Sequence, residues 1–290
     1  MGGSQIWLEE RETLTVEEML KAICLNSAND CVVAMSEFIA GSEEEFVARM
    51  NSKARELGMH DTTFKNPHGL DVDDHVTSSY DIALMSRELL NKHPSIIQYT
   101  SLYMDSLRDG KTELVNTNKL VRNYQGCTGL KTGSTSLALY NLSASATRDG
   151  LSLIAVIMHS PSSDIRFAEA QKLLNYGFSN FTNISFGKKD DIVGIVNVEK
   201  GLKSEIKAIL EEDASLFIEK SKSSQVVQNI SFSDTVEAPI EQGAVIGQVT
   251  YSVGDNVIKT VNVVANESVE KINLINMTTN LFNNWFRMMR

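Results

Sequence analysis

The spacing of apolar positions predicts helices at the start of the chain. Thr15 and Glu18 have the spacing of a capping box, so a helix is expected to begin directly after the threonine, with its apolar residues on one face. This pattern breaks at a run of small polar residues, and a second helix is expected over about 30–39. The sequence therefore places Ser27 and Asn29 in a break between two helices.

The remaining pattern of the first 180 residues alternates between helical and strand-like spacing, separated by turn residues. Helices are expected over 43–57, 79–91 and 165–176, the last one stopping at Gly177, and strands over 96–106, 112–117, 126–147 and 151–159. Short turns rich in Asp and Gly join the strands as hairpins. The predicted fold class is α/β, with a helical cluster packed on an antiparallel sheet.

From about residue 183 the spacing changes to short β-rich runs at 193–198, 245–253 and 257–264. A small all-β domain is expected over 183–265, after a larger domain over 1–180. The tail over 266–290 becomes helical again from residue 269, and its many asparagines argue against a bilayer span. An amphipathic helix lying on a membrane surface is one interpretation, and a helix docked on the protein or used for dimerisation is the other.

Composition narrows the classes of partner. The chain has 290 residues, a formal net charge of -10 and a pI near 5.1, which disfavours nucleic acid and other polyanions as partners. Its three cysteines lack the spacing of a zinc site or a disulfide framework, so neither a metal site nor a set of disulfides is expected. Cys24 and Cys31 are expected to be apolar core residues. The first residues lack the basic start and apolar run of a secretory signal.

Candidate chemistry begins at Lys131, Thr132 and Gly133, which open a predicted strand. Lys-Thr-Gly following an upstream Ser-x-Asn is part of the signature of penicillin-binding proteins and class A β-lactamases, and Ser27-Ala-Asn29 supplies the upstream part. Each residue also has a plainer interpretation. Ser27 and Asn29 could be turn and capping residues, and Lys131 could be an exposed lysine at the end of a strand.

Taken together, these motifs resemble the low-molecular-mass penicillin-binding proteins, the serine D-alanyl-D-alanine carboxypeptidases of peptidase family S11. The resemblance extends over nearly the whole chain. It rests on the stretches LTVEEMLKAICLNSANDCVVAMSEFIAGSEEEFVARMN (14–51), HGLD (68–71), GLKTGST (129–135), YNLSASAT (140–147) and LLNYGF (173–178), and on the β-rich region and tail. It implies a transpeptidase-like domain followed by the β domain, and no cofactor.

The resemblance also implies roles on the lysine strand. Lys131 and Thr132 would bind the carboxylate of a peptide ending in D-Ala-D-Ala, which requires a fixed cation. Gly133 would let the peptide backbone approach and add to the strand edge. The backbone N–H of Ser134 would supply half of an oxyanion hole.

At the helix break, the resemblance implies that Ser27 relays a proton to the departing amine together with Lys131. Asn29 would hold the substrate amide and orient the catalytic lysine of the family. His68, in the HGLD stretch, is expected to be a structural loop residue, because no nucleophile is visible beside it.

One part of the family pattern is absent. Members carry the nucleophilic serine and its lysine in a Ser-x-x-Lys motif before Ser-x-Asn, and the 26 residues before Ser27 do not contain it. Three matches occur later, at 185–188, 204–207 and 268–271, and are attributed to chance. The expectation is therefore a chain without the N-terminal part of the family, through a start codon assigned at an internal methionine or deliberate shortening.

Three functions remain open. The first is a serine D-Ala-D-Ala carboxypeptidase acting on peptidoglycan stem peptides and inhibited by β-lactams, with this chain itself inactive. The second is a non-catalytic chain that binds peptidoglycan peptides or a partner protein, and the third is a class A β-lactamase-like hydrolase. By resemblance, the complete enzyme would be extracytoplasmic and membrane-associated, with 269–290 as a possible contact with the membrane surface.

Overall fold

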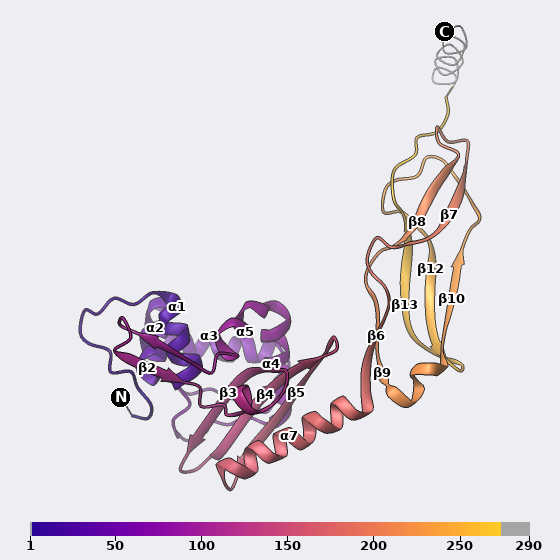
Figure 1. Ribbon diagram of the computed structural model, residues 1–290. Coiled ribbons are helices and arrows are strands. Elements are labelled where there is room, and N and C mark those ends of the chain that lie inside the picture. The colour runs from indigo at the N-terminus through magenta and orange to yellow at the C-terminus, as the bar shows by residue number, and fades with distance from the viewer. Residues whose placement is uncertain (1, 274–290) are drawn as a thin grey trace. The chain divides into compact units, whose positions relative to one another are not determined.

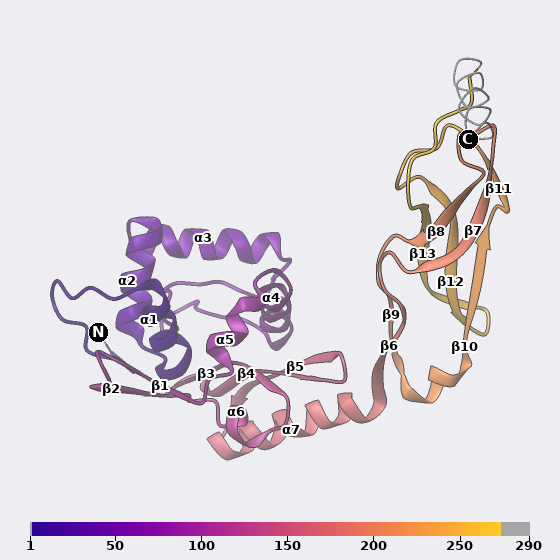
Figure 2. The same ribbon diagram turned by 45° about the horizontal axis from the view of Figure 1, so that its top comes forward.

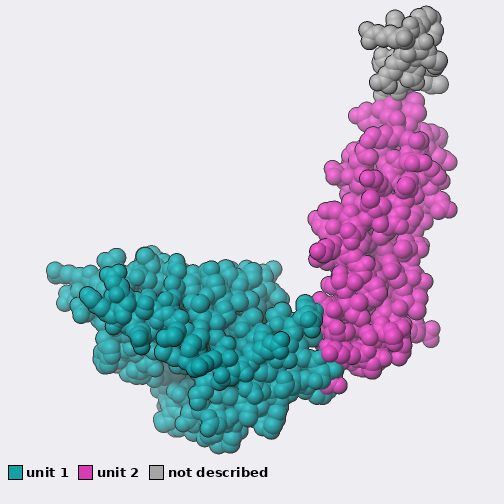
Figure 3. Space-filling model, in the orientation of Figure 1, with its two compact units in different colours: residues 1–179 teal, residues 180–290 magenta. Residues whose placement is uncertain are grey.

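The computed structural model describes residues 2–273. The chain divides into two compact units, residues 1–179 and residues 180–290, which are coloured separately in Figure 3. Each unit has its own hydrophobic core and is described by itself. The candidate residues between 27 and 134 all lie in the first unit.

The first unit follows the predicted order of a helical cluster and then a sheet (Figure 1). Its helical elements are α1 (Val16–Lys21), η1 (Ala22–Asn26), α2 (Asn29–Ala40), α3 (Glu43–Glu56), α4 (Ser79–Lys92), η2 (Pro94–Ile96), α5 (Ile97–Thr100), α6 (Leu120–Asn123) and α7 (Ser163–Asn180). Its strands are β1 (Met104–Leu107), β2 (Thr112–Val115), β3 (Cys127–Thr135), β4 (Leu139–Arg148) and β5 (Leu151–Ser160). The capping box at Thr15 and Glu18 is confirmed, with both reciprocal hydrogen bonds present.

An antiparallel sheet of three strands, in the order β3-β4-β5, forms the middle layer of this unit. The cluster α1–α5 lies on one face and α7 runs along the other, as both ribbon views show (Figures 1 and 2). A buried hydrogen bond of 2.7 Å between Ser86 of α4 and Ser143 of β4 joins the sheet to the cluster. The predicted α/β fold class is confirmed, and β3 lies at one edge of the sheet.

A compact core lies beneath the helix break. It is shared by the N-terminal segment, α1, η1, α2 and the β1–β2 hairpin, and its buried members are Ile6, Met19, Ala22, Cys24, Leu25, Ala28, Cys31, Leu107 and Leu114. Cys24 and Cys31 are buried, free thiols, as expected for small apolar residues. Apolar burial stabilises by roughly 25 cal/mol per Å², and η1 contributes Ala22, Cys24 and Leu25 to this core, so burial stabilises the position of η1.

The strand expected over 96–106 is wrong in its first half, where η2 and α5 form instead. Pro94 occupies the first position of the turn, where its fixed φ and missing N–H favour helix. Ile96 and Tyr99, three residues apart, pack on the same core, which is helical spacing. The short helix α6 was not predicted, and it interrupts the chain just before β3.

The run 126–147 is two strands rather than one. β3 and β4 pair antiparallel through a turn in which Thr135 faces Leu139. The helix expected to stop at Gly177 continues to residue 180, because this glycine serves packing instead of termination. A Cβ at Gly177 would lie 2.5 Å from Cδ1 of Leu153, so its absence lets α7 approach β5.

The second unit is all β within residues 181–273 apart from one short 3-10 helix. Its elements are β6 (Phe181–Gly187), β7 (Ile192–Glu199), β8 (Glu205–Leu210), β9 (Ala214–Glu219), η3 (Lys220–Gln225), β10 (Val226–Phe232), β11 (Thr235–Glu237), β12 (Val245–Val253) and β13 (Asn256–Ala265). The strands predicted over 193–198, 245–253 and 257–264 are confirmed as β7, β12 and β13. A sheet in the order β10-β12-β13-β8-β7-β11 surrounds a core that includes Val249 and Tyr251.

The helix expected from residue 269 does not begin there. Val269 forms a bridge with Ile240, and Lys271 forms one with Gly201, so the chain is extended at this point. These contacts provide backbone partners that a helix would remove. The rest of the predicted tail helix, residues 274–290, lies outside the described residues. Within residues 2–273, no helix is both long enough and apolar enough to cross a membrane.

Candidate active site

The break between α1 and α2 is a π-helical turn that ends at Ser27. The backbone N–H groups of both Ser27 and Ala28 donate to the carbonyl of Ala22, which widens the last turn of η1. Ser27 is left-handed, with φ 59 and ψ 38, a strained conformation for a residue with a side chain. Among the described residues its half-buried hydroxyl has no hydrogen-bond partner, so the oxygen is available to a ligand.

Asn29 is the first residue of α2, one position earlier than the predicted start of that helix. Its backbone N–H donates to the carbonyl of Ser4 at 2.8 Å, and its side-chain Nδ2 donates to the carbonyl of Gly2 at 2.9 Å. A Cβ on Gly3 would lie 2.4 Å from this Nδ2, so the N-terminal segment approaches through a glycine. The carboxamide of Asn29 is therefore held in one orientation.

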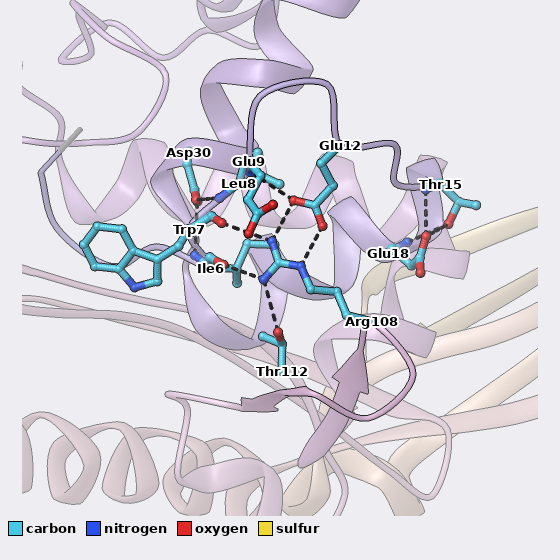
Figure 4. A network of polar contacts seen from close by, with 10 residues as sticks. All are labelled: Ile6, Trp7, Leu8, Glu9, Glu12, Thr15, Glu18, Asp30, Arg108 and Thr112. Carbon is cyan, nitrogen blue, oxygen red and sulfur yellow. Dashed lines mark hydrogen bonds and ion pairs between the residues drawn. The ribbon is translucent and has the colours of Figure 1, made fainter.

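A network around Arg108 fastens the N-terminal segment to the rest of the unit (Figure 4). Arg108 donates to the carbonyls of Ile6 and Trp7 and forms two bonds with the carboxylate of Glu12. Asp30, the second residue of α2, accepts hydrogen bonds from the backbone N–H groups of Ile6 and Leu8. Residues 2–8 are thus fixed against the helix break from both sides.

Lys131 points from β3 toward the helical cluster. It pairs across the sheet with Ser143, whose hydroxyl contacts α4, and paired residues share a face. Burial lowers the pKa of Lys131 from 10.5 to about 8, and its Nζ donates to the carbonyl of Thr132 at 3.0 Å. The plainer interpretation, an exposed lysine at the end of a strand, is wrong, because Lys131 is half-buried.

The rest of the Lys-Thr-Gly strand is a free edge. Thr132 is nearly buried, and its hydroxyl lies 2.6 Å from that of Thr117. Gly133 is exposed, and a Cβ built on it would meet nothing within 4 Å. Ser134 is also exposed and pairs with Tyr140 on the inner side. Since β4 occupies only one side of β3, the other side can receive an extended peptide.

The predicted site has two halves, the helix break at 27–29 and the Lys-Thr-Gly part of β3. The structure brings them to the same region without a direct hydrogen bond between them. Burial raises the pKa of Cys24, in η1, and the positive charge of Lys131 opposes that rise. Thr117 bridges the halves by donating its N–H to the carbonyl of Leu25 and sharing a hydrogen bond with Thr132. Among residues 2–273, no hydrogen bond joins Lys131 to Ser27 or Asn29.

The HGLD stretch acts as a support for the turn after β3. Asp71 accepts hydrogen bonds from the hydroxyl of Thr135 at 2.6 Å and from the N–H of Leu137 at 3.3 Å. His68 accepts a bond from the N–H of Leu70, and burial lowers the pKa of its imidazole. His68 is therefore a neutral loop residue above that pKa, in agreement with the structural role expected from the sequence.

Two residues of this region were missed by the sequence analysis. Arg166 of α7 is buried, and its Nη1 donates to the carbonyls of Gly133 and Asn141 at 3.3 and 3.0 Å, so it supports the strand from behind. Thr117 was predicted only as the end of a strand. The polar triplet at 116–118, directly before the lysine strand, is the signal that could have singled it out.

The three late Ser-x-x-Lys matches do not form a nucleophile and base. All lie in the second unit, at 185–188, 204–207 and 268–271, and none is in a helix. Only a helix brings residues three apart onto the same face on adjacent turns. The described part of the chain therefore offers a free strand edge beside a half-buried lysine and an unpaired hydroxyl, without a recognisable acylation pair.

Comparison with known proteins gives consistent results. The pattern of the D-alanyl-D-alanine carboxypeptidase family matches residues 1–162, and that of the C-terminal domain of penicillin-binding protein 5 matches residues 181–271. The chain is 41% identical over 289 residues to D-alanyl-D-alanine carboxypeptidase DacF of Bacillus subtilis, covering 98% of this chain and 74% of that protein.

Solved structures agree with the sequence comparisons. Penicillin-binding protein 5 of Haemophilus influenzae superposes with a TM-score of 0.74 at 30% identity, covering 93% of this chain and 78% of that one. Penicillin-binding protein D2 of Listeria monocytogenes, in its ampicillin-bound form, superposes with a TM-score of 0.57 at 31% identity, covering 61% and 74%. The chain belongs to peptidase family S11, the serine-type D-alanyl-D-alanine carboxypeptidases.

Proposed function

We propose that the first unit carries the substrate-binding edge of a D-Ala-D-Ala carboxypeptidase that acts on peptidoglycan stem peptides through an acyl-serine. The observation that supports this most is that Lys131, which is half-buried and whose pKa is lowered by burial, lies on a strand with one free edge. A buried cation without a carboxylate partner is costly, and an anionic ligand would offset that cost. The C-terminal carboxylate of the stem peptide is such an anion.

In this proposal the peptide adds antiparallel to the free side of β3. Lys131 and the Thr132 hydroxyl bind its carboxylate, and the open space over Gly133 admits its backbone. The N–H of Ser134 then donates to the developing oxyanion. The support for this arrangement is that all four residues are consecutive on one edge strand.

At the helix break, Ser27 relays a proton to the leaving amine, and Asn29 holds the substrate amide. The Nδ2 of Asn29 is already bonded to Gly2, so its carbonyl oxygen is the atom left for a substrate N–H. The left-handed backbone at Ser27 projects its hydroxyl out of the helical ladder. Both assignments require the ligand to bridge the break and β3.

We also propose that this chain by itself does not form an acyl-enzyme, because none of its Ser-x-x-Lys matches precedes Ser27. The test is the intact mass of the chain after incubation with a penicillin. An unchanged mass is expected, and a stable adduct of one penicillin would overturn the statement. Nitrocefin turnover, measured in parallel, would instead support the class A β-lactamase alternative.

Binding without catalysis is the second candidate, and it rests on the same strand edge. A peptide ending in D-Ala-D-Ala is titrated against the chain and against Lys131→Ala, with Lys111→Ala, an exposed lysine of the β1–β2 turn, as the matched control. Loss of affinity in Lys131→Ala alone supports the carboxylate role. Equal affinity of all three proteins would refute it.

For the remaining regions we propose that residues 183–265 form a separate β domain of an extracytoplasmic enzyme and that 269–290 contact a membrane surface. The match of residues 181–271 to the C-terminal domain of penicillin-binding protein 5 supports the β domain, and the membrane contact rests on the apolar positions of the sequence over 269–290. β-Lactams are proposed as inhibitors of the complete enzyme, since a similar structure contains ampicillin. Vesicle co-sedimentation of the chain, with and without residues 274–290, tests the membrane part.

A further inference from the structure

Thr117 lies between the two halves of the candidate active site. Its backbone N–H donates to the carbonyl of Leu25, in the π-helical turn before Ser27, at 3.1 Å. Its hydroxyl oxygen lies 2.6 Å from the hydroxyl oxygen of Thr132, the threonine of the Lys-Thr-Gly strand. One residue therefore contacts both the helix break and the edge strand.

Two buried asparagines hold Thr117 in this position. Asn116 is 5% exposed, and its side chain donates to the carbonyls of Thr100 and Leu102 at 3.1 and 2.8 Å. Asn118 is fully buried, and its side chain donates to the carbonyl of Gly129 in β3 at 3.0 Å. Each flanking side chain is satisfied by backbone groups, so the segment is anchored to α5 and β3 independently of Thr117.

Thr117 is exposed, so its side chain does not share the packing role of its two buried neighbours. Its side chain is exposed, whereas Asn116 and Asn118 on either side are buried, so the threonine makes little contribution to the core. Thr132 is 9% exposed, and its backbone carbonyl accepts a hydrogen bond from the ammonium of Lys131. A hydroxyl pair at the mouth of a cationic site is suited to an anion that approaches from solvent.

Which of the two hydroxyls donates in this hydrogen bond decides whether a carboxylate bound at Thr132 faces a hydrogen or a lone pair. Each hydroxyl has one hydrogen, and only one of the two hydrogens lies between the oxygens. If Thr132 donated to Thr117, its own hydrogen would be used and only a lone pair would face a carboxylate. If Thr117 donates, the Thr132 hydrogen stays free and the acceptance of one bond strengthens the next.

We propose that Thr117 is a positioning residue for carboxylate recognition, donating its hydroxyl hydrogen to Thr132 so that Thr132 donates to the ligand carboxylate. The inference rests on the proposed function, since it names a residue that prepares the same site. It gives Thr117 a role through Thr132 and predicts that the hydroxyl of residue 117, rather than its shape, matters.

The experiment compares two forms of one peptide ending in D-Ala-D-Ala, the free acid and the C-terminal amide, by titration calorimetry or NMR. The proteins are the wild-type chain, Thr117→Val, Thr117→Ser and Lys131→Ala. Valine keeps the volume of threonine and removes the hydroxyl, whereas serine keeps the hydroxyl. The measured quantity is the ratio of the two affinities, acid over amide.

The wild-type chain and Thr117→Ser are expected to prefer the acid, and Thr117→Val is expected to lose about threefold to tenfold of that preference, the range of one hydrogen bond. Affinity for the amide should change little, and a merely structural role would lower both affinities together. An unchanged preference in Thr117→Val, with the preference abolished in Lys131→Ala, overturns the inference and leaves the proposed function intact. No preference in the wild-type chain overturns both.

Discussion

Arg108 and Glu12 form a bidentate ion pair that joins the β1–β2 turn to the N-terminal segment. Nε lies 2.6 Å from Oε1, and Nη2 lies 2.7 Å from Oε2, with side chains 24% and 18% exposed. The same guanidinium donates to the carbonyls of Ile6 and Trp7. Because that segment also supplies the carbonyls that orient Asn29, the pair acts on the candidate site through the backbone.

Arg108→Lys is expected to lower the free energy of unfolding by about 1.5–3 kcal/mol. Lysine keeps the positive charge but cannot reproduce the planar set of donors that reaches two carbonyls and both carboxylate oxygens. Urea denaturation measures the change. The matched control is Arg11→Lys, since Arg11 and its partner Glu10 are each 91% exposed and should change stability by less than about 0.5 kcal/mol. Equal effects of the two substitutions would contradict the role of the pair.

The same pair predicts an acid-sensitive contribution to stability. The hydrogen bond from Arg108 lowers the pKa of Glu12 from 4.5 to about 2. Since the folded pKa lies below the unfolded one, the stabilisation is present above pH 4.5 and is lost as pH falls toward 2. The free energies of unfolding of wild type and Glu12→Gln should therefore converge over this window. If the two curves stay parallel, ionised Glu12 does not stabilise the folded chain.

The lowered pKa of Lys131 predicts a second dependence of the free energy of unfolding on pH, at alkaline pH. Burial lowers its folded pKa from 10.5 to about 8, so the unfolded chain binds more protons between these values. Stability supplied by this residue therefore rises as pH increases from 8 to 10.5. Relative to Lys131→Met, the wild-type chain should gain on the order of 3 kcal/mol across that window, measured by urea denaturation. A relative loss would mean that the ammonium is stabilised in the folded chain.

Sequence reasoning recovered much of the fold because the signals were local. The capping box at Thr15, the helices α3 and α4, and the strands β7, β12 and β13 follow from spacing and turn residues alone. It failed where tertiary contacts override those signals. Gly177 has the character of a helix stop, yet its contact with Leu153 uses the glycine for close packing. Residues 96–100 are helical because Ile96 and Tyr99 share one core.

The candidate site was predicted in its residue types and only partly in its geometry. Lys131, Thr132 and Gly133 carry a motif that can be read along the chain. The burial of Lys131 cannot be read in this way, because it depends on the cluster that covers that face of β3. Thr117 and Arg166 approach the strand from distant parts of the sequence, so no local pattern announces them.

Two glycines of similar backbone conformation provide a sharp test of the packing before β3. Gly126 has φ 76 and Gly110 has φ 84, so alanine meets similar backbone strain at both. A Cβ on Gly126 would lie 2.4 Å from the carbonyl oxygen of Thr147, whereas one on Gly110 would meet nothing within 4 Å. Gly110→Ala should cost about 1 kcal/mol and Gly126→Ala at least about 3 kcal/mol in urea denaturation. Similar costs would mean that the backbone near residue 147 moves freely.

Gly133 allows binding and folding to be separated in one substitution. Nothing lies within 4 Å of a Cβ built there, and its φ is not left-handed, so Gly133→Ala should change the free energy of unfolding by less than about 0.5 kcal/mol. A peptide on the free side of β3 would meet that methyl group, so affinity for a D-Ala-D-Ala peptide should fall about tenfold, or about 1.4 kcal/mol. Ser134→Ala is the neighbouring control, because it leaves the backbone N–H of residue 134 in place and should bind as wild type does. If Gly133→Ala binds the peptide normally, the peptide does not run along this edge, and the bare backbone needs another explanation.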